Sequence, residues 1–107
     1  MESVGVDLFD LRGHAYLTMV DRFSGYVWVQ KLRKTTTAAI LDVMSQWFYD
    51  VGFPLTIRSD NGPQFRSEFQ AWCSRFGVKD ETSSPYHPRS NGLAEAAVKN
   101  VLSLIHI

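Results

Sequence analysis

Three carboxylates lie at positions from which the chain can bring them together. Asp7 is inside the apolar run VGVDLF, on the face opposite to the two valines. Asp60 follows the apolar run PLTI after only two residues, and the turn-forming Asn-Gly-Pro comes directly after it. Glu95 lies one turn into a final helical segment. Three carboxylates without a histidine pair or a thiolate cluster favour a hard divalent ion, Mg²⁺ or Mn²⁺.

Each of these acids also has an ordinary structural interpretation. Asp60 is compatible with a simple surface turn, and Glu95 with an ion pair to Lys99 four residues later. A charged residue inside a strand is costly unless it is exposed, paired or bound to metal, so Asp7 is the least ordinary of the three. On spacing alone, both interpretations remain open.

The composition predicts one globular domain. The chain has 107 residues, of which 45% are hydrophobic, and its eleven basic and eleven acidic residues cancel. This balance argues against a purely electrostatic DNA clamp, which usually shows a basic excess. The single cysteine, Cys73, excludes an internal disulfide and a paired-cysteine zinc site, and we expect it in the core.

The elements that must position the carboxylates form a β-β-β-α-β-α-β-α series. Apolar alternation and turn residues predict strands, and helical spacing with flanking threonine, glycine and proline predicts helices. Ser67 and Gln70 have the spacing of a capping box at the start of the second helix. The predicted strands are 3–9, 15–20, 25–32, 55–59 and 78–82, and the helices are about 37–51, 67–77 and a last one from about 90.

These elements predict an α/β fold, a mixed five-stranded sheet flanked by helices. The first three strands have connections too short for parallel crossovers and should form an antiparallel meander. The strand at 55–59 is reached through a helix and should run parallel to the first. Asp7 and Asp60 would then converge on the same edge of the sheet.

Two motifs carry a family resemblance. SDNGPQF, followed at a distance by SSPYHPRSNGLAEAAVK, resembles the catalytic core of retroviral and LTR-retrotransposon integrases, in particular the gypsy-type branch. The opening VGVDLFDLRGHAYLTMVDRFSGYVWV fits the start of the same family. The resemblance spans residues 3 to about 101 and implies an RNase H-like fold, truncated at its C-terminal end, with residues 1–101 as a partial core domain.

The resemblance implies roles for particular residues. Asp7, Asp60 and Glu95 match the metal-binding catalytic triad, with two Mg²⁺ or Mn²⁺ ions expected when DNA is bound. Thirty-four residues, 61–94, separate the last two, one fewer than in the retroviral pattern. Arg89 stands where the family commonly has glutamine. The residues expected to contact DNA are Asn61, Tyr86, His87, Arg89, Ser90, Asn91 and Lys99.

The implied activity is metal-dependent phosphodiester cleavage and DNA strand transfer, with element ends and target DNA as partners. The intact protein is expected to be a nuclear homo-oligomer without a membrane segment, since no apolar run approaches ~20 residues and no signal peptide is recognisable. The alternatives are a non-catalytic, domesticated or decayed nucleic-acid-binding domain and a bacterial-type transposase of the same chemistry. The intact triad disfavours the non-catalytic domain, and the motif SPYHPRSNGLAE disfavours the transposase.

The last six residues, LSLIHI, are interpreted separately. They match the translation of a transposase end sequence used in sequencing-library adapters, so residues 102–107 are expected to be an artefact. The competing interpretation is a genuine helix end, in which Leu102 and Ile105 continue the apolar stripe.

Overall fold

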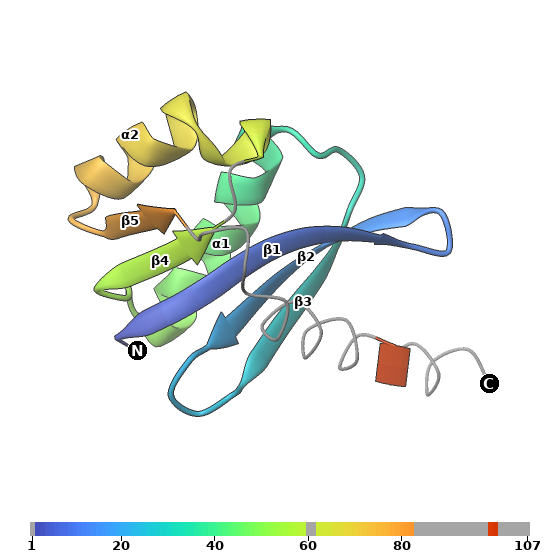
Figure 1. The fold of residues 1–107 in the computed structure, drawn as a ribbon, viewed down its shortest axis with the longest axis horizontal. Coiled ribbons are helices and arrows are strands. Elements are labelled where there is room, and N and C mark those ends of the chain that lie inside the picture. Colours follow the sequence, from blue (N-terminus) through green and yellow to red (C-terminus); the bar gives the residue numbers. More distant parts are fainter. Residues whose placement is uncertain (1, 60–61, 83–98, 101–107) are drawn as a thin grey trace.

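The computed structural model describes residues 2–59, 62–82 and 99–100. Within them the elements follow the predicted order, β-β-β-α-β-α-β, with a short 3₁₀ turn before the second helix (Figure 1). The elements are β1 (Ser3–Leu11), β2 (His14–Asp21), β3 (Val27–Leu32), α1 (Thr37–Val51), β4 (Thr56–Ser59), η1 (Pro63–Phe65), α2 (Ser67–Arg75) and β5 (Lys79–Thr82).

The strands form one mixed sheet in the order β3-β2-β1-β4-β5. The pairs β1–β2 and β2–β3 are antiparallel, whereas β1–β4 and β4–β5 are parallel. Both predictions for the sheet, the antiparallel meander and the parallel fourth strand, are therefore confirmed. The central strand is β1, which carries Asp7.

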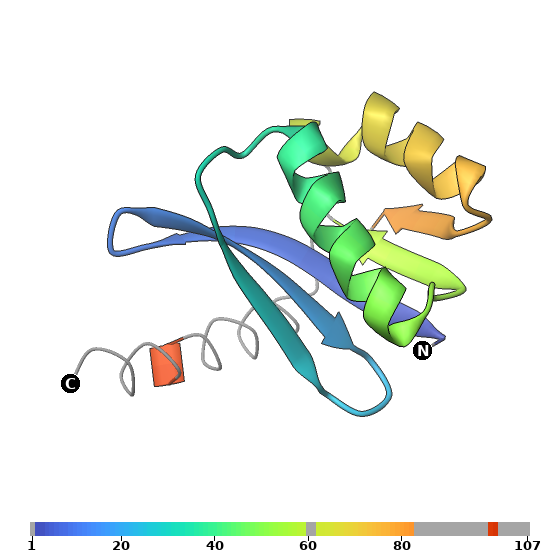
Figure 2. The same ribbon diagram turned by 180° about the vertical axis from the view of Figure 1, so that it is seen from behind.

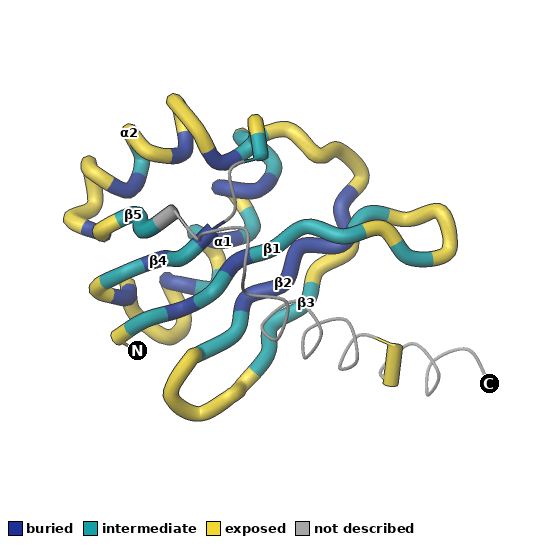
Figure 3. The backbone as a smooth tube through the Cα atoms, in the orientation of Figure 1, coloured by how far each residue is buried: buried dark blue, intermediate teal, exposed yellow. Residues whose placement is uncertain are grey.

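The helices α1 and α2 cover one face of this sheet, and no helix in the described part of the chain covers the other (Figures 1 and 2). The core lies between the helices and the sheet (Figure 3). Helix α1 contributes Ile40, Leu41, Met44 and Phe48 to it, at the spacing of one helical face. The single thiol, Cys73, is buried in this core as expected.

The hairpin of β1 and β2 sets the register around Asp7. Its two turn residues, Arg12 and Gly13, have φ of 52° and 78°, as a two-residue type I′ turn requires. Both strands are longer than predicted, because pairing continues up to this turn and joins Leu11 to His14. The turn places Thr18 opposite Asp7.

Two details of α2 differ from the prediction. Arg66, and not Ser67, occupies the N-cap position, and no side chain caps the helix there, so the capping box is wrong. The reason is that η1 leads directly into the helix and shifts its start by one residue. The helix also ends at Arg75, because Gly77, with φ of 70°, closes it in a Schellman arrangement.

Candidate active site

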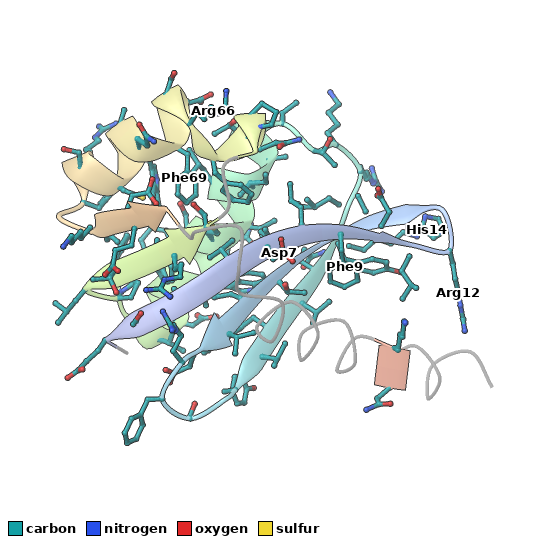
Figure 4. All side chains as sticks on the ribbon, in the orientation of Figure 1. Asp7, Phe9, Arg12, His14, Arg66 and Phe69 are labelled. Atoms are coloured by element: carbon teal, nitrogen blue, oxygen red, sulfur yellow. The ribbon has the colours of Figure 1, made fainter. Side chains whose placement is uncertain are left out.

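Asp7 occupies a half-buried position in the middle of the sheet. Its side chain shares a face with Gly5 and Phe9, the face that neither α1 nor α2 covers (Figure 4). The Thr18 hydroxyl donates a hydrogen bond of 3.4 Å to the Asp7 backbone carbonyl, and the Thr18 side chain is buried. Asp7 lies on the central strand and is paired with Thr18 of β2, so its backbone is well placed to keep its position when a ligand binds.

The end of β4 lies beside β1. The parallel register pairs Val4 with Ile57 and Gly5 with Arg58. Ser59 is the last residue of β4, is buried, and donates from its hydroxyl to the Asp80 carboxylate at 3.4 Å. The position from which the chain enters Asp60 is therefore held within the sheet.

The segment that follows Asp60 and Asn61 is tied to the first helix. Gly62 accepts a hydrogen bond of 3.0 Å from the Phe65 amide, which closes η1. The Thr37 hydroxyl, at the start of α1, donates 2.9 Å to the Gln64 carbonyl. The chain is thus anchored on both sides of position 60, by β4 before it and by η1 and α1 after it.

Charged neighbours of the site lie on β4 and β5. Arg58 and Glu81 face each other across the two strands with 3.5 Å between a guanidinium nitrogen and a carboxylate oxygen. Asp80 lies one residue earlier, next to Ile57 on the helix-covered face. Burial raises the pKa of Asp80, and the hydrogen bond from Ser59 opposes that rise.

Several predicted site residues lie outside the described residues. These are Asp60, Asn61, Tyr86, His87, Arg89, Ser90, Asn91 and Glu95. Lys99 is described and is exposed. Within the described ranges no three His, Cys, Asp or Glu side chains gather as a metal site would require, but two members of the predicted triad fall outside those ranges.

Sequence reasoning missed the residues that support the site. Thr18, Thr37 and Ser59 each fix a backbone or a neighbour around the carboxylate positions. Thr18 was detectable, since a two-residue turn at Arg12 and Gly13 already dictates that it pairs with Asp7. The other two contacts join segments far apart in sequence and carry no local signal.

Comparison with known proteins identifies relatives of this chain. The family model of the integrase core domain matches residues 6–88. The chain is 41% identical over 88 residues to the Gag-Pro-Pol polyprotein of human T-cell leukemia virus 2 and 38% identical over 89 residues to an uncharacterized protein of Caenorhabditis elegans. It covers 6% and 7% of those proteins, while the matches include 78% and 82% of the chain itself.

Two solved structures have the same fold. The simian T-cell lymphotropic virus intasome, in complex with PP2A regulatory subunit B56 gamma, matches with a TM-score of 0.81 at 27% identity over 98% of this chain and 40% of that one. The HTLV-2 integrase catalytic core domain in complex with magnesium, in a trimeric form, matches with a TM-score of 0.76 at 30% identity. That match covers 97% of this chain and 70% of the other. With its RNase H-like sheet and helices, the chain belongs to the integrase core domain family.

Proposed function

We propose that this chain is the catalytic core of a retrotransposon integrase, which cleaves DNA phosphodiester bonds and transfers DNA strands with the help of divalent metal ions. The observation that carries the proposal is the register of β1 and β4. Continued by two residues, the pairing of Gly5 with Arg58 would set position 60 opposite Asp7. The two carboxylates would then share one edge of a rigid, parallel strand pair.

The chemistry of the donor set fits Mg²⁺ or Mn²⁺. Carboxylate oxygens are the preferred protein ligands of both ions, and Asp7 is half-buried on a face without a described helix. Asp7, Asp60 and Glu95 would hold two ions when DNA is bound. Such a pair of metals activates an attacking oxygen and stabilises the leaving one in a phosphodiester displacement.

The chain's own residues would supply positioning. β1 would hold Asp7 and the end of β4 would hold Asp60, and a turn at the Asn-Gly-Pro that follows would lead the chain away and leave room for a phosphate. Asn61, Tyr86, His87, Arg89, Ser90, Asn91 and Lys99 would contact the DNA around the scissile bond, as the motif resemblance implies. Lys99, which is exposed, is available to a phosphate.

The wider assembly is part of the same proposal. The related structures are an intasome and a trimeric core domain, and we infer that the intact protein also acts as a homo-oligomer on element ends and target DNA. Joining DNA to a host genome would place it in the nucleus. Among the described residues, no helix is both long and apolar enough to cross a membrane.

The proposal is tested by Mn²⁺-dependent nicking, or reversal of strand transfer, on a branched DNA substrate. Activity should be weak in wild type and fall to background in Asp7→Asn and in Glu95→Gln. Asp10→Asn is the matched control, because Asp10 is an exposed carboxylate three residues further along the same strand. DNA binding without any metal-dependent cleavage would support the non-catalytic alternative instead.

A further inference from the structure

Positive charge is concentrated at one end of the sheet although the whole chain is neutral. Residues 8–16 and 30–36 contain four Lys or Arg residues and one carboxylate, Asp10, a local net charge of 4 − 1 = +3. The four cations are Arg12, Lys31, Arg33 and Lys34, which we call the basic end. All four side chains are exposed.

The strand register brings these four residues together. Ala15 pairs with Leu32 and Tyr16 with Lys31, so β3 finishes beside the β1–β2 turn. Arg33 and Lys34 follow Leu32 directly, and Ala15, the partner of Leu32, is only three residues after the turn residue Arg12. Arg12 projects from the tip of this hairpin, well beyond the body of the sheet (Figure 4).

One member of the basic end, Lys31, lies on the same face of the sheet as Asp7. Pairing places Phe9, Tyr16 and Lys31 in one row across β1, β2 and β3, two residues beyond the row of Asp7, Thr18 and Val29. Because side chains alternate between faces, Asp7 and Lys31 share a face. The rings of Phe9 and Tyr16 lie between them, stacked with centroids 5.8 Å apart.

Within the described part of the chain, none of the four cations forms an ion pair with a carboxylate. Exposed cations without carboxylate partners are suited to a polyanion. Arg12 is five residue steps along the chain from Asp7, a distance of roughly 17 Å at the rise of a strand, which corresponds to about five base pairs of duplex at ~3.4 Å per strand phosphate.

We propose that the basic end is a second DNA-contacting surface, which holds the phosphate backbone of a duplex that extends from the active site along β1 toward the β1–β2 turn. This inference rests on the proposed integrase function, because it assigns the surface to the DNA on which the triad acts. The contact is to phosphates and carries no base specificity.

The salt dependence of DNA binding tests this surface. A variant with Lys31→Gln, Arg33→Gln and Lys34→Gln should bind a short mixed-sequence duplex roughly tenfold or more weakly at low salt, with a log Kd–log salt slope shallower by about 2–3. Arg12 is kept, because its positive φ makes substitution there harder to interpret. Binding is measured by fluorescence anisotropy in EDTA, so that it does not depend on catalysis.

The matched control changes the same amount of charge elsewhere. Arg22, Arg75 and Lys79 are exposed and lie in the β2–β3 turn, at the end of α2 and at the start of β5, away from the basic end. Their replacement by glutamine should leave the slope nearly unchanged. Equal effects of both triple variants, or no effect of the first, would overturn the inference.

The outcome is separable from that of the proposed function. If wild type nicks DNA and the Lys31, Arg33 and Lys34 variant keeps the wild-type slope, this inference falls and the proposed function stands. If the basic end governs binding and nicking is absent even in wild type, the catalytic proposal falls and the binding surface stands. Circular dichroism melts of both triple variants verify that each is folded.

Discussion

At the scale of single residues, the proposed site depends on three carboxylates that would bind divalent metal ions together. A ligand that binds the native state alone raises the melting temperature. We therefore expect Mg²⁺ or Mn²⁺ to raise the Tm of the folded chain, and Asp60→Asn to remove most of that shift. Thermal melts with and without metal measure this. Equal shifts in wild type and variant would mean that the ions bind elsewhere.

The negative charge of Asp80 lowers the stability of the folded protein. Burial raises its pKa above the usual 3.8, so the folded protein holds a proton there more tightly than the unfolded chain does. The associated stability is fully present below the usual Asp pKa and is lost as the pH rises through the raised value. At neutral pH the ionised carboxylate is therefore a cost.

Asp80→Asn should raise the Tm by a few degrees at neutral pH, and this gain should shrink as the pH falls through the raised pKa of Asp80 and be smallest below the usual Asp pKa. Asparagine keeps an oxygen that accepts the Ser59 hydroxyl, so the hydrogen bond is retained. Asp42→Asn, at an exposed position on α1, is the control. A gain that does not change with pH would show that packing, and not charge, is responsible.

Cys73 should be chemically silent in the folded protein. Burial, and after it the charge of Asp80, raises the pKa of the thiol to about 12. At pH 8 only about one thiol in ten thousand is then ionised, and the thiolate is the reactive form. Alkylation by iodoacetamide, followed by mass spectrometry, should be slow in buffer and fast in denaturant. Rapid labelling of the native chain would contradict the burial of this side chain.

At the scale of elements, α1 both closes the core and braces the turn after Asp60. Its N-cap, Thr36, accepts a hydrogen bond of 3.2 Å from the Ala39 amide, and the next residue, Thr37, holds Gln64. The capping bond satisfies one of the free amides of the first helical turn. Loss of the cap should therefore destabilise the core and the site together.

Thr36→Ala should lower the free energy of unfolding by about 1 kcal/mol. For a domain of this size such a loss lowers the Tm by about 4–8 °C. Thr35→Ala is the matched control, one residue earlier, where the described residues provide no hydrogen bond to the hydroxyl. A similar loss in both variants would assign the effect to the linker and not to the cap.

At the scale of the whole molecule, the chain spans 40% of the related intasome chain and 6% of the related viral polyprotein. Its net charge is zero, and affinity for DNA grows with the number of phosphates that a protein neutralises. The four cations of the basic end would contact DNA phosphates locally, but they would neutralise few phosphates in total.

We therefore expect the 107-residue chain to act on one DNA end at a time and not to join two ends in concert. Gel analysis of strand-transfer products from paired, labelled ends distinguishes the two outcomes. Nicking and reversal on a branched substrate serve as the positive control. Concerted products from this chain alone would show that contacts outside it are not required.

Much of the fold was determined by the sequence itself. Alternation in VGVDLF, the apolar stripe of 37–51 and the turn residues between them specify which segments become strands and helices, since both depend on local periodicity. The motifs around Asp60 and Glu95 indicated the integrase core, and the family is confirmed. Local signals erred at α2, where a preceding 3₁₀ turn displaced the expected cap from Ser67 to Arg66.

Only the tertiary structure decided how these parts meet. The pairing of β1 with β4, the bond from Thr37 to Gln64 and the link from Ser59 to Asp80 join segments that are far apart along the chain. Strand pairing also brings Arg12 toward Lys31, Arg33 and Lys34 at one end of the sheet. The net charge of zero does not reveal this basic cluster. Periodicity determines each element separately, whereas contacts between elements depend on strand order and register, which the chain settles only when its core packs.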